Sequence, residues 1–486
     1  MNNNISENIK NINNKKEYKP KACVITFGCQ QNEADSEKIR GMLLVMGYDI
    51  IDADMTSDVG GDYGKFNKSD ETSVLALCDV VILNTCAVRE HAELKTFSRT
   101  GQLKHYKNKN KNLLIGICGC MVEQEHILEY IRKSFPYVDF TFGTRSIDKF
   151  PEILYERLVT QKKVIRKENI IYEEEIITED LPVYRDSLYK ARISVMYGCN
   201  NFCSYCVVPY VRGGERSRSK DKILEEAYEL INSGYKEIML LGQNVNSYKD
   251  PDDLNYRFTD LLTDILKIGS DYDYWVRFIT SHPKDVPDRL INLMSENEKL
   301  AGHFHLPVQA GSDRILKLMN RKYTRENYLE LIKKLKTKVK DIAVTSDIIV
   351  GFPSETEEDF KETLDIIREA EFDNIFPFIY SKRENTPAAR MEDKITRKEK
   401  TDRFARLVKI QNEISVRKNK AYEGKTIKVL VESEYKNNKD NKENNLAGRS
   451  SANKLVIFEG DINLIGSFVN IKINESRLHG LYGEKV

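Results

Sequence analysis

The sequence predicts an α/β protein with three parts: an N-terminal doubly wound parallel sheet, a central partial (β/α)6 barrel and a small C-terminal β-barrel. Three observations predict this fold. Short apolar runs alternate with helical periodicity from residue 21 to residue 143, and six strand-and-helix units follow one another from residue 193 to residue 380. Beyond residue 426 the strands become short and are separated by turn residues, which is typical of a small barrel.

Composition is that of a globular protein. Of the 486 residues, 40% are hydrophobic and 31% are charged, and the length predicts roughly two to four domains. No apolar run reaches the roughly 18 residues that a membrane helix needs, so we expect no membrane association. Residues 1–20 are rich in Asn, Lys and Glu, and we expect a disordered tail rather than a signal peptide.

Cysteine usage and net charge limit the possible partners. Nine cysteines without a secretion signal favour a reducing compartment, the cytoplasm, where thiols are metal ligands or reactive groups more often than disulfides. The net charge of +1 gives no overall attraction to nucleic acid, so any such attraction must be local.

The first predicted domain covers residues 21–158 and alternates strands with helices. Its predicted strands are Lys21–Phe27, Leu77–Asn84, Asn112–Ile117 and Val138–Gly143. Its predicted helices are Glu33–Met46, Arg89–Tyr106 and Glu123–Lys133. This order predicts a parallel, doubly wound sheet with its ligand site beyond the carboxyl ends of the strands. Residues 52–73 are interpreted as a surface loop, and residues 151–186 as a linker.

Three cysteines directly follow three of these strands. Cys29, Cys86 and Cys120 are far apart in sequence, yet the predicted fold brings them to one edge of the sheet. They form a candidate three-thiolate site, and the alternative is three incidental loop cysteines. The remaining cysteines of this domain, Cys23, Cys78 and Cys118, fall within or beside apolar runs and are interpreted as core packing.

A second cysteine group opens the central domain, residues 185–415. Cys199, Cys203 and Cys206 have the spacing C-x3-C-x2-C on a loop after a predicted strand. Thiolates are soft ligands for zinc or iron–sulfur clusters, and three of them leave one iron of a four-iron cluster open for a substrate. A structural zinc site usually takes four ligands, so a zinc knuckle that lacks a ligand, or three buried thiols, are the alternatives.

The central domain predicts functional residues at the carboxyl ends of its strands. The predicted strands are Ile193–Met196, Glu237–Leu241, Val276–Thr280, His303–Pro307, Ala343–Val350 and Asn374–Tyr380, with helices such as Lys220–Ser233 and Arg325–Leu335 between them. The candidates for cofactor binding are Gln243, Asn244, Ser281, Gln309 and Gly311. Gly351 and Ser354 lie at such an end as well, but a turn residue and a helix cap are the alternatives for them. The alternative for His282 is a turn histidine with its hydrogen bonds satisfied.

The last part of the chain combines a basic stretch with a small barrel. Residues 394–428 are strongly basic and include a predicted helix. The basic side chains either form a solvated surface or bind phosphate groups in a salt-sensitive way. The predicted strands of the barrel domain, residues 418–483, are Thr426–Glu432, Asn445–Arg449, Lys454–Phe458 and Ser467–Ile473. Residues 434–444 are interpreted as a loop, and small barrels of this type commonly bind nucleic acid.

These motifs together resemble one family, the radical S-adenosylmethionine (SAM) methylthiotransferases, over almost the whole chain. The cysteine loop, with Tyr205 before its third Cys, is similar to the radical SAM core. Residues 26–37 (TFGCQQNEADSE), 84–90 (NTCAVRE) and 119–121 (GCM) resemble the N-terminal domain of the family. The C-terminal barrel resembles a TRAM domain, an RNA-binding module.

The resemblance implies cofactors and a reaction. It implies two [4Fe-4S] clusters, one on Cys199, Cys203 and Cys206 and one on Cys29, Cys86 and Cys120, so that these six cysteines carry the catalysis. One SAM would be cleaved to start radical chemistry, a second would donate a methyl group, and the second cluster would present the sulfur. The expected partners are the tRNA anticodon stem-loop and an electron donor of the flavodoxin or ferredoxin type, and the expected state is a monomer.

Residues 28–30 (GCQ), 207–213 (VVPYVRG) and 240–246 (LLGQNVN) are most similar to the branch that methylthiolates C2 of N6-isopentenyladenosine (dimethylallyladenosine) in tRNA. The alternatives are a methylthiotransferase for threonylcarbamoyl-adenosine or a ribosomal protein, and a non-catalytic RNA-binding protein with structural zinc. Gln31, the length of the 52–73 loop and Asn385, where the family usually has Gly, depart from the family pattern.

Overall fold

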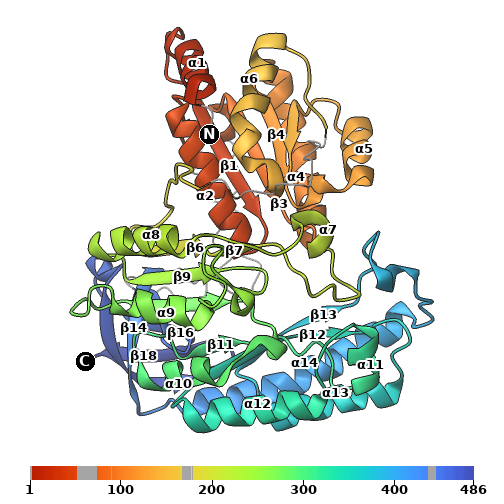
Figure 1. Cartoon of the computed structure of the whole chain (residues 1–486), viewed down its shortest axis with the longest axis vertical. Coiled ribbons are helices and arrows are strands. Elements are labelled where there is room, and N and C mark those ends of the chain that lie inside the picture. The colour runs from red at the N-terminus through yellow and green to blue at the C-terminus, as the bar shows by residue number, and fades with distance from the viewer. Residues whose placement is uncertain (1–2, 52–73, 89, 167–176, 178, 436–444) are drawn as a thin grey trace. The chain divides into compact units, whose positions relative to one another are not determined.

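The computed structural model describes residues 3–51, 74–88, 90–166, 177, 179–435 and 445–486 (Figure 1). The chain forms two compact units. The first contains Met1–Asp186, Tyr197–Cys199 and Val207–Arg216, and the second contains Ser187–Met196, Asn200–Cys206 and Ser217–Val486. The expected loop at 52–73 and nearly all of the one at 434–444 lie outside the described residues. No described helix is long and apolar enough to cross a membrane.

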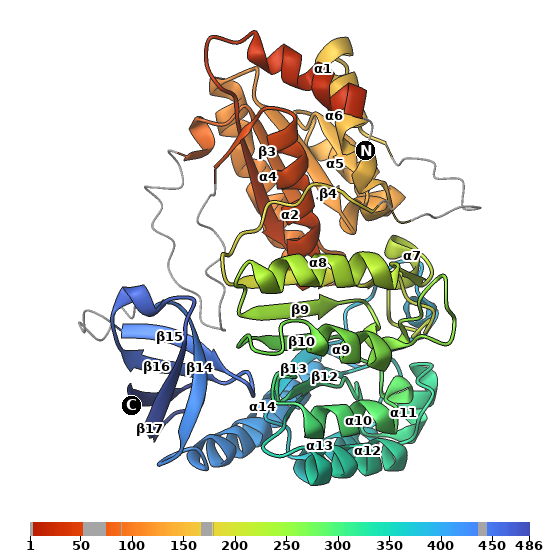
Figure 2. The ribbon, with the colours of Figure 1, turned by 60° about the vertical axis from the view of Figure 1, so that its left-hand side comes forward.

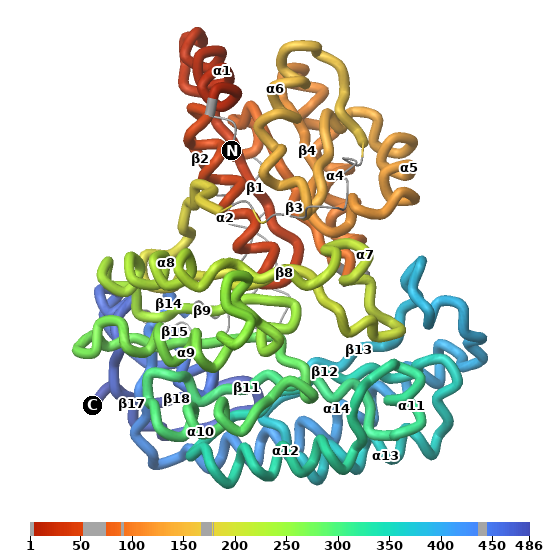
Figure 3. The backbone as a smooth tube through the Cα atoms, viewed as in Figure 1, coloured from red at the N-terminus to blue at the C-terminus, as the bar shows by residue number. Residues whose placement is uncertain are grey.

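The first unit contains the predicted parallel sheet, with strands in the order β2-β1-β3-β4-β5. Figure 3 labels the first four of them. The strands are β1 (Lys21–Phe27), β2 (Asp49–Ile50), β3 (Val80–Thr85), β4 (Leu114–Gly119) and β5 (Phe140–Phe142). Each neighbouring pair is parallel. β1 has the predicted bounds, because its apolar run is buried along nearly its full length. This strand order changes direction between β1 and β3, which is where doubly wound sheets bind ligands.

Helices cover both faces of this sheet. On one face lie α1 (Asn3–Asn14), α2 (Gln30–Val45) and α6 (Phe150–Thr160), whose apolar residues share a core cluster with β1 and β3. On the other face lie α4 (Glu90–Lys109) and α5 (Glu125–Ser134), in a second cluster. Both faces are therefore buried, which explains why the strands are apolar along their whole length.

Two expectations for the first unit were wrong. Residues 1–20 were expected to be disordered, but α1 forms there because Ile5, Ile9 and Ile12 recur at helical spacing in an otherwise polar segment, and Ile9 is fully buried. The linker expected over residues 151–186 begins as helix α6, which buries Ile153 and Leu154.

The second unit contains six parallel strands in two three-stranded sheets, ordered β10-β9-β6 and β11-β12-β13. The strands are β6 (Lys190–Ser194), β9 (Glu237–Leu241), β10 (Trp275–Ile279), β11 (His303–His305), β12 (Ala343–Val350) and β13 (Asn374–Ile379). A parallel bridge joins Val276 of β10 to Leu300, in the segment that leads into β11. Among the described strands, β6 and β13 each pair on one side only, so the predicted (β/α)6 barrel is partial.

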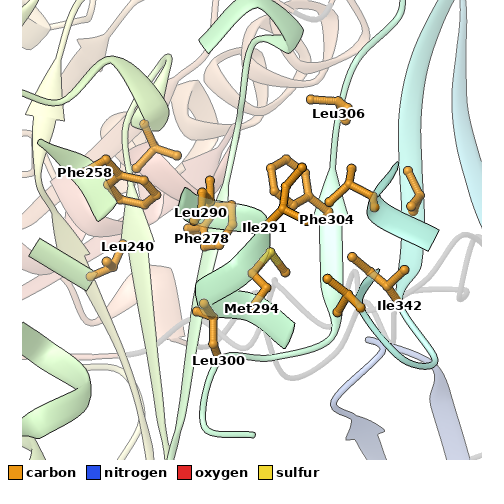
Figure 4. Close-up of a cluster of buried hydrophobic side chains, with 14 of the residues drawn as sticks. Leu240, Phe258, Phe278, Leu290, Ile291, Met294, Leu300, Phe304, Leu306 and Ile342 are labelled. Atoms are coloured by element: carbon orange, nitrogen blue, oxygen red, sulfur yellow. The ribbon is translucent and has the colours of Figure 1, made fainter. Parts of the chain in front are cut away.

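The helices of this barrel pack on its outer face, and their bounds are α8 (Lys220–Asn232), α9 (Phe258–Lys267), α10 (Asp288–Glu296), α11 (Asp313–Leu318), α12 (Arg325–Lys338), α13 (Glu357–Ala370) and α14 (Arg397–Lys420). Figure 4 shows part of the core between strands and helices, where Leu240, Phe278 and Phe304 of the strands meet Phe258 and Ile291 of the helices. Every second strand residue contributes to this core, so the alternate residues line the inner face of the barrel.

The C-terminal strands form a closed barrel in the order β14-β15-β16-β18-β17 (Figure 2). They are β14 (Thr426–Glu434), β15 (Asn445–Ser450), β16 (Leu455–Glu459), β17 (Phe468–Ser476) and β18 (Leu481–Lys485). The four predicted strands are present. The fifth, β18, was missed because its sequence, LYGEK, is mostly polar and buries only Leu481.

Arg277 attaches this small barrel to the larger one within the second unit. Its two terminal nitrogens donate to the carbonyl oxygens of Ser450 and Ser451, each at 2.8 Å. Its Nε donates to the buried carboxylate of Glu237 at 2.5 Å. Burial alone would raise the pKa of Glu237, but Arg277 and Lys190 hold that pKa below its ordinary value.

We expect Arg277→Leu to lower the free energy of unfolding of the second unit by about 3 kcal/mol, because Glu237 would stay buried without its main cation. Because the pKa of Glu237 is lower in the folded than in the unfolded state, the contribution of this pair is fully present above the unfolded pKa, near 4.5, and is lost progressively as the pH falls from there through the folded pKa. Urea denaturation at pH 7 and at a series of pH values below that unfolded pKa measures both effects. Arg368→Leu, which removes an exposed ion pair with Asp365, should change stability by less than about 1 kcal/mol.

Candidate functional site

The first unit brings together Cys29, Cys86 and Cys120 at the carboxyl ends of three adjacent strands. Phe27 at the end of β1 pairs with Thr85 at the end of β3, and Thr85 pairs with Gly119 at the end of β4. The strands therefore end level with one another, and each is followed by its cysteine within two residues. Cys29 is also the N-cap of α2, where the partial positive charge of the helix favours a thiolate.

The backbone around these cysteines is held by an asparagine and by a glycine in the left-handed region. Asn32 accepts from the backbone N–H of Cys29 at 3.3 Å and donates to Asn84 and to the carbonyl of Thr85, each at 3.2 Å. Gly119 has a φ of +99°, and a Cβ there would lie 2.3 Å from the carbonyl oxygen of Thr85. Asn32, Thr85 and Gly119, which lie in the segments that resemble the family, are therefore connected at this edge of the sheet.

The thiols interact with one another. A hydrogen bond from Cys86, and then the charge of Arg212, lowers the pKa of Cys29 well below the usual thiol value. The same bond, followed by burial, raises the pKa of Cys86. Burial raises the pKa of Cys120, an effect that the nearby Arg212 opposes. Such mutual effects require proximity, so the edge of the sheet collects the three thiols as the sequence predicts.

Arg212 is a residue of this site that the sequence analysis missed as a partner of these thiols. It lies at the end of α7 (Val208–Arg212), and its Nε donates to Sγ of Cys120 at 3.2 Å. Its Nη2 donates to Asp35 at 2.8 Å, and the side chains of both residues are almost fully buried. The helix is held in place by Val207 and Val211, which pack against Cys120. Arg212 thus supplies a fixed positive charge beside the thiols.

Three soft thiols beside a buried guanidinium are of the ligand type that iron–sulfur clusters take. Within the described ranges, no three His, Cys, Asp or Glu side chains are arranged to hold one metal ion. Each cysteine of a cluster binds its own iron, so thiols that are not arranged around one ion can still hold a cluster. Soft thiolates beside a buried guanidinium suit the negative charge of such a group.

The C-x3-C-x2-C loop is divided between the two units. Cys199 belongs to the first, where its N–H donates to the carbonyl of Gly213 at 3.2 Å. Cys203 and Cys206 belong to the second and form a tight turn, with the N–H of Cys206 donating to the carbonyl of Cys203 at 2.9 Å. The neighbouring Ser204 donates from its hydroxyl to the carbonyl of Leu318 at 2.8 Å, which fixes this turn to the end of α11.

A second buried arginine, Arg321, lies beside this loop. Its Nη1 donates to Sγ of Cys203 at 3.4 Å, and its Nη2 donates to the carbonyl of Pro307 at 2.8 Å. Burial alone would lower the pKa of Arg321, but Tyr323, Tyr205 and Cys203 raise it. Each cysteine group therefore has a buried guanidinium bonded to one thiol, a feature that no local sequence pattern indicates.

The five residues expected to bind the cofactor lie at the carboxyl ends of the strands, as predicted. Asn244 donates to Asp285 at 2.8 Å and accepts from the N–H of His282 at 3.1 Å. Ser281 donates to Asn246 at 3.0 Å. Asn244 and Ser281 therefore tie the loops after β9 and β10 together. Gln243 is half-buried in the first of these loops.

Gln309 and Gly311 belong to the loop after β11. Gln309 is buried with a φ of +73°, and its N–H donates to the carbonyl of Asp347 at 2.9 Å. A Cβ at Gly311 would lie 2.3 Å from the carbonyl oxygen of Glu362 in α13, so the glycine permits close packing. Contact of these five residues with SAM stays a prediction.

Several other candidate residues have structural roles. Burial lowers the pKa of His282 to about 2, so it is neutral, and its Nδ1 accepts from the N–H of Lys284. This agrees with the interpretation as a turn histidine. Gly351 and Ser354 occupy left-handed turn positions with φ of +69° and +70°. Asn385, at the family's usual glycine position, has a φ of +68° and so keeps the turn.

The basic helix α14 is bonded largely to the rest of its own unit. Arg403 donates to the buried Glu355 at 2.7 Å, and Lys418 donates to Asp373 at 2.5 Å. Further pairs join Lys400 to Asp393, Arg406 to Glu357 and Arg417 to Glu371. These cations stabilise the packing of the helix, so the charge run is mainly structural and is only in part a solvated face.

Cys23, Cys78 and Cys118 lie in the hydrophobic clusters of the first unit, as expected. Burial raises the pKa of Cys118 well above the usual thiol value, which keeps it protonated. These three thiols are core residues.

Comparison with known families divides the chain into three matched regions. The Radical SAM superfamily matches residues 193–367, and the TRAM domain matches residues 420–486. The uncharacterized protein family UPF0004 matches residues 65–143. The radical SAM match implies SAM and a [4Fe-4S] cluster.

Curated relatives are similar over nearly the full length. The tRNA-2-methylthio-N(6)-dimethylallyladenosine synthase of Acetivibrio thermocellus is 48% identical over 485 residues, which cover 99% of this chain and 95% of that protein. The protein of the same name from Clostridium perfringens is 49% identical, over 96% of this chain and 97% of that protein.

Among solved structures, the radical SAM methyltransferase TsrM from Kitasatospora setae has a TM-score of 0.54 at 12% identity, covering 76% of this chain and 74% of that one. The cobalamin-dependent radical SAM enzyme OxsB has a TM-score of 0.51 at 13% identity, covering 81% of this chain and 56% of that one. At these identities the likeness concerns the fold alone, and it agrees with the predicted α/β architecture.

Proposed function

We propose that this chain, which belongs to the radical SAM methylthiotransferase family of the tRNA-2-methylthio-N(6)-dimethylallyladenosine synthases, replaces the C2 hydrogen of N6-dimethylallyladenosine next to the tRNA anticodon with a methylthio group. The single observation that carries the proposal is the meeting of Cys29, Cys86 and Cys120 in a unit separate from the radical SAM strands. The resemblance implies that this second set of thiols presents the sulfur that is inserted.

We further propose two [4Fe-4S] clusters. Cys199, Cys203 and Cys206 would hold the one that the superfamily implies, and Cys29, Cys86 and Cys120 would hold another. When bound, these groups and two SAM molecules supply the radical chemistry, the sulfur and the methyl group that an unreactive aromatic C–H bond requires.

The chain's own residues hold these ligands in place. Arg212 and Arg321 each donate to one thiol and offset negative charge in a buried setting. Asn32 fixes the turn that carries Cys29, and Asn244 fixes the loops at the carboxyl ends of β9 and β10. The carboxyl ends of the barrel strands would place the adenosine against the cofactors.

The remaining parts of the proposal concern partners. We propose that the C-terminal barrel contributes to binding the anticodon stem-loop, because the TRAM match covers this whole barrel. We also propose a flavodoxin- or ferredoxin-type electron donor, a monomeric state and a cytoplasmic location.

The experiment is a nucleoside mass analysis. Anaerobically reconstituted protein, SAM, sulfide and reductant are incubated with tRNA that carries N6-dimethylallyladenosine. A gain of one methylthio group on that nucleoside is the expected result. A gain on threonylcarbamoyl-adenosine or on a ribosomal protein instead would keep the chemistry and reject the substrate.

A further inference from the structure

The inner face of the second half of the barrel carries an aromatic pair that the fold does not bury. Along β13, Ile375 points toward the helices and is only 4% exposed, while Phe376 and Phe378 on the opposite face are 44% and 36% exposed. Two exposed phenylalanines side by side on a strand contribute little to the core. Exposed apolar surface rimmed by polar residues is a feature of ligand-binding grooves.

The register of the sheet places a carboxylate beside these rings. β12 and β13 lie side by side in Figure 1, and Asp347 pairs with Phe376 while Ile349 pairs with Phe378. Paired residues in parallel strands point to the same face, so all four side chains line the inside of the barrel. The neighbours of Asp347 on β12, Ser346 and Ile348, point to the helix side.

A chain of polar contacts orients this carboxylate. Nε2 of His305 lies 3.5 Å from Oδ1 of Asp347, and Nδ1 of His305 lies 3.0 Å from Oγ1 of Thr345. Nε2 of His303 lies 2.9 Å from the same hydroxyl. Because a carboxylate only accepts, we assign the proton of His305 to Nε2, so that Thr345 donates to His305 and His303 donates to Thr345. The ring of His305 also meets Phe376 edge to face, with centroids 5.7 Å apart.

The second oxygen of Asp347 remains available to a ligand. Among the described residues, Oδ2 has no hydrogen-bond partner, and the side chain is 29% exposed. The result is an acceptor that points along an aromatic wall inside the barrel. A ligand that matches it needs a flat apolar body with an N–H donor at its edge.

We propose that Phe376, Phe378 and Asp347 form the surface that recognises the N6-substituted adenine. The inference rests on the proposed function and specifies how the substrate is selected. The purine ring stacks on the aromatic pair, because bases that leave their stack are held on aromatic side chains. The dimethylallyl group contacts the same apolar wall, and the one hydrogen left on N6 donates to Oδ2 of Asp347.

This surface discriminates between substrates on two grounds. An adenine without the dimethylallyl group leaves part of the phenylalanine surface exposed to water, which weakens its binding. A base with a carbonyl at the position of N6 brings an acceptor against the carboxylate, and a site built for an N–H donor rejects such a base strongly.

The test measures binding and turnover of anticodon stem-loops with and without the dimethylallyl group. The variants are Phe376→Ala, Phe376→Leu, Phe378→Ala and Asp347→Asn. The control is Tyr228→Ala, which removes an exposed aromatic ring on the outer helix α8. Fluorescence anisotropy gives Kd for each RNA, nucleoside mass analysis gives kcat/KM, and thermal melting verifies that each variant is folded.

We expect Phe376→Ala to weaken binding of the dimethylallylated RNA by about 10- to 100-fold. Binding of the unmodified RNA should change much less, so the ratio of its Kd to that of the dimethylallylated RNA should fall toward one. Phe376→Leu should restore part of the preference, because leucine keeps apolar surface but cannot stack on the base. Asp347→Asn should reduce kcat/KM, because its amide N–H groups can face the N6–H donor of the base instead of accepting from it. The Tyr228→Ala control should match the wild type.

The outcomes separate this inference from the proposed function. If the wild type methylthiolates dimethylallyladenosine and the folded variants keep its Kd ratio and kcat/KM, the recognition surface lies elsewhere and the function stands. If the wild type shows no preference for the dimethylallylated RNA and no product on it, the proposed function itself fails.

Discussion

Cys86→Ala is expected to cleave SAM at close to the wild-type rate and to form no methylthiolated tRNA. Cys86 lies in the first unit with Cys29 and Cys120, whereas Cys203 and Cys206 belong to the radical SAM unit. Loss of one of three thiols removes a ligand that the proposed second cluster requires. Chromatographic detection of 5′-deoxyadenosine and mass analysis of tRNA nucleosides, performed on one reaction, measure the two activities separately.

A matched control for this variant is Cys118→Ala. Cys118 lies on β4, next to the strand that Cys86 follows, but its thiol belongs to the hydrophobic core and not to the three-thiol site. It should keep product formation and lose only a little stability. Methylthiolated product from Cys86→Ala at the wild-type level would contradict the role proposed for this thiol.

Cys203→Ala is expected to abolish SAM cleavage and therefore every later step. Cys203 is the thiol that Arg321 contacts, and its loss removes one of the three proposed ligands to the SAM-binding cluster. The iron content should fall toward half of the wild-type value, and 5′-deoxyadenosine should drop to the level measured without protein.

Two other variants serve as controls for Cys203→Ala. Ser204→Ala alters the same turn without touching a thiol, and should cost about 1 kcal/mol of stability for its lost hydrogen bond to Leu318 while cleavage continues. Cys86→Ala, which keeps the radical SAM cysteines, should still produce 5′-deoxyadenosine. Continued cleavage in Cys203→Ala would show that another residue completes the site.

Elements with continuous apolar runs could be predicted from the sequence almost to the residue. β1 and β9 have the predicted bounds, because each is buried by helices on at least one face and its apolar run reflects that burial. β12 also has the predicted bounds, although polar residues interrupt its apolar run. Helix α1 was missed because its polar composition concealed three isoleucines at helical spacing. The fifth strand of the small barrel is polar and is defined by its neighbours β16 and β17, not by its own residues.

Some residues of the candidate site could be predicted from the sequence, and others could not. The positions of Cys29, Cys86 and Cys120 followed from the topology, because parallel strands end at a common edge. Arg212 could not be predicted as a partner of Cys120, nor Arg321 as a partner of Cys203, because each arginine lies 92 or 118 residues from its cysteine in sequence. The recognition surface was also hidden, because Asp347 and Phe376 come together only through the register of β12 and β13.

The hydrogen bonds that Arg277 makes to the small barrel depend on the identity of Arg277 but not on the identity of the two acceptor residues. Arg277 bonds to the main-chain carbonyls of Ser450 and Ser451, which every amino acid at those two positions would supply. Drift at the barrel positions therefore leaves these bonds in place, whereas drift at Arg277 removes both together. A substitution at Arg277 removes both main-chain bonds at once, whereas a change of side chain at Ser450 or Ser451 leaves both acceptors in place. Other pairs, such as Lys190 with Glu432 and Lys454 with Asp373, still join the two barrels after Arg277 is lost.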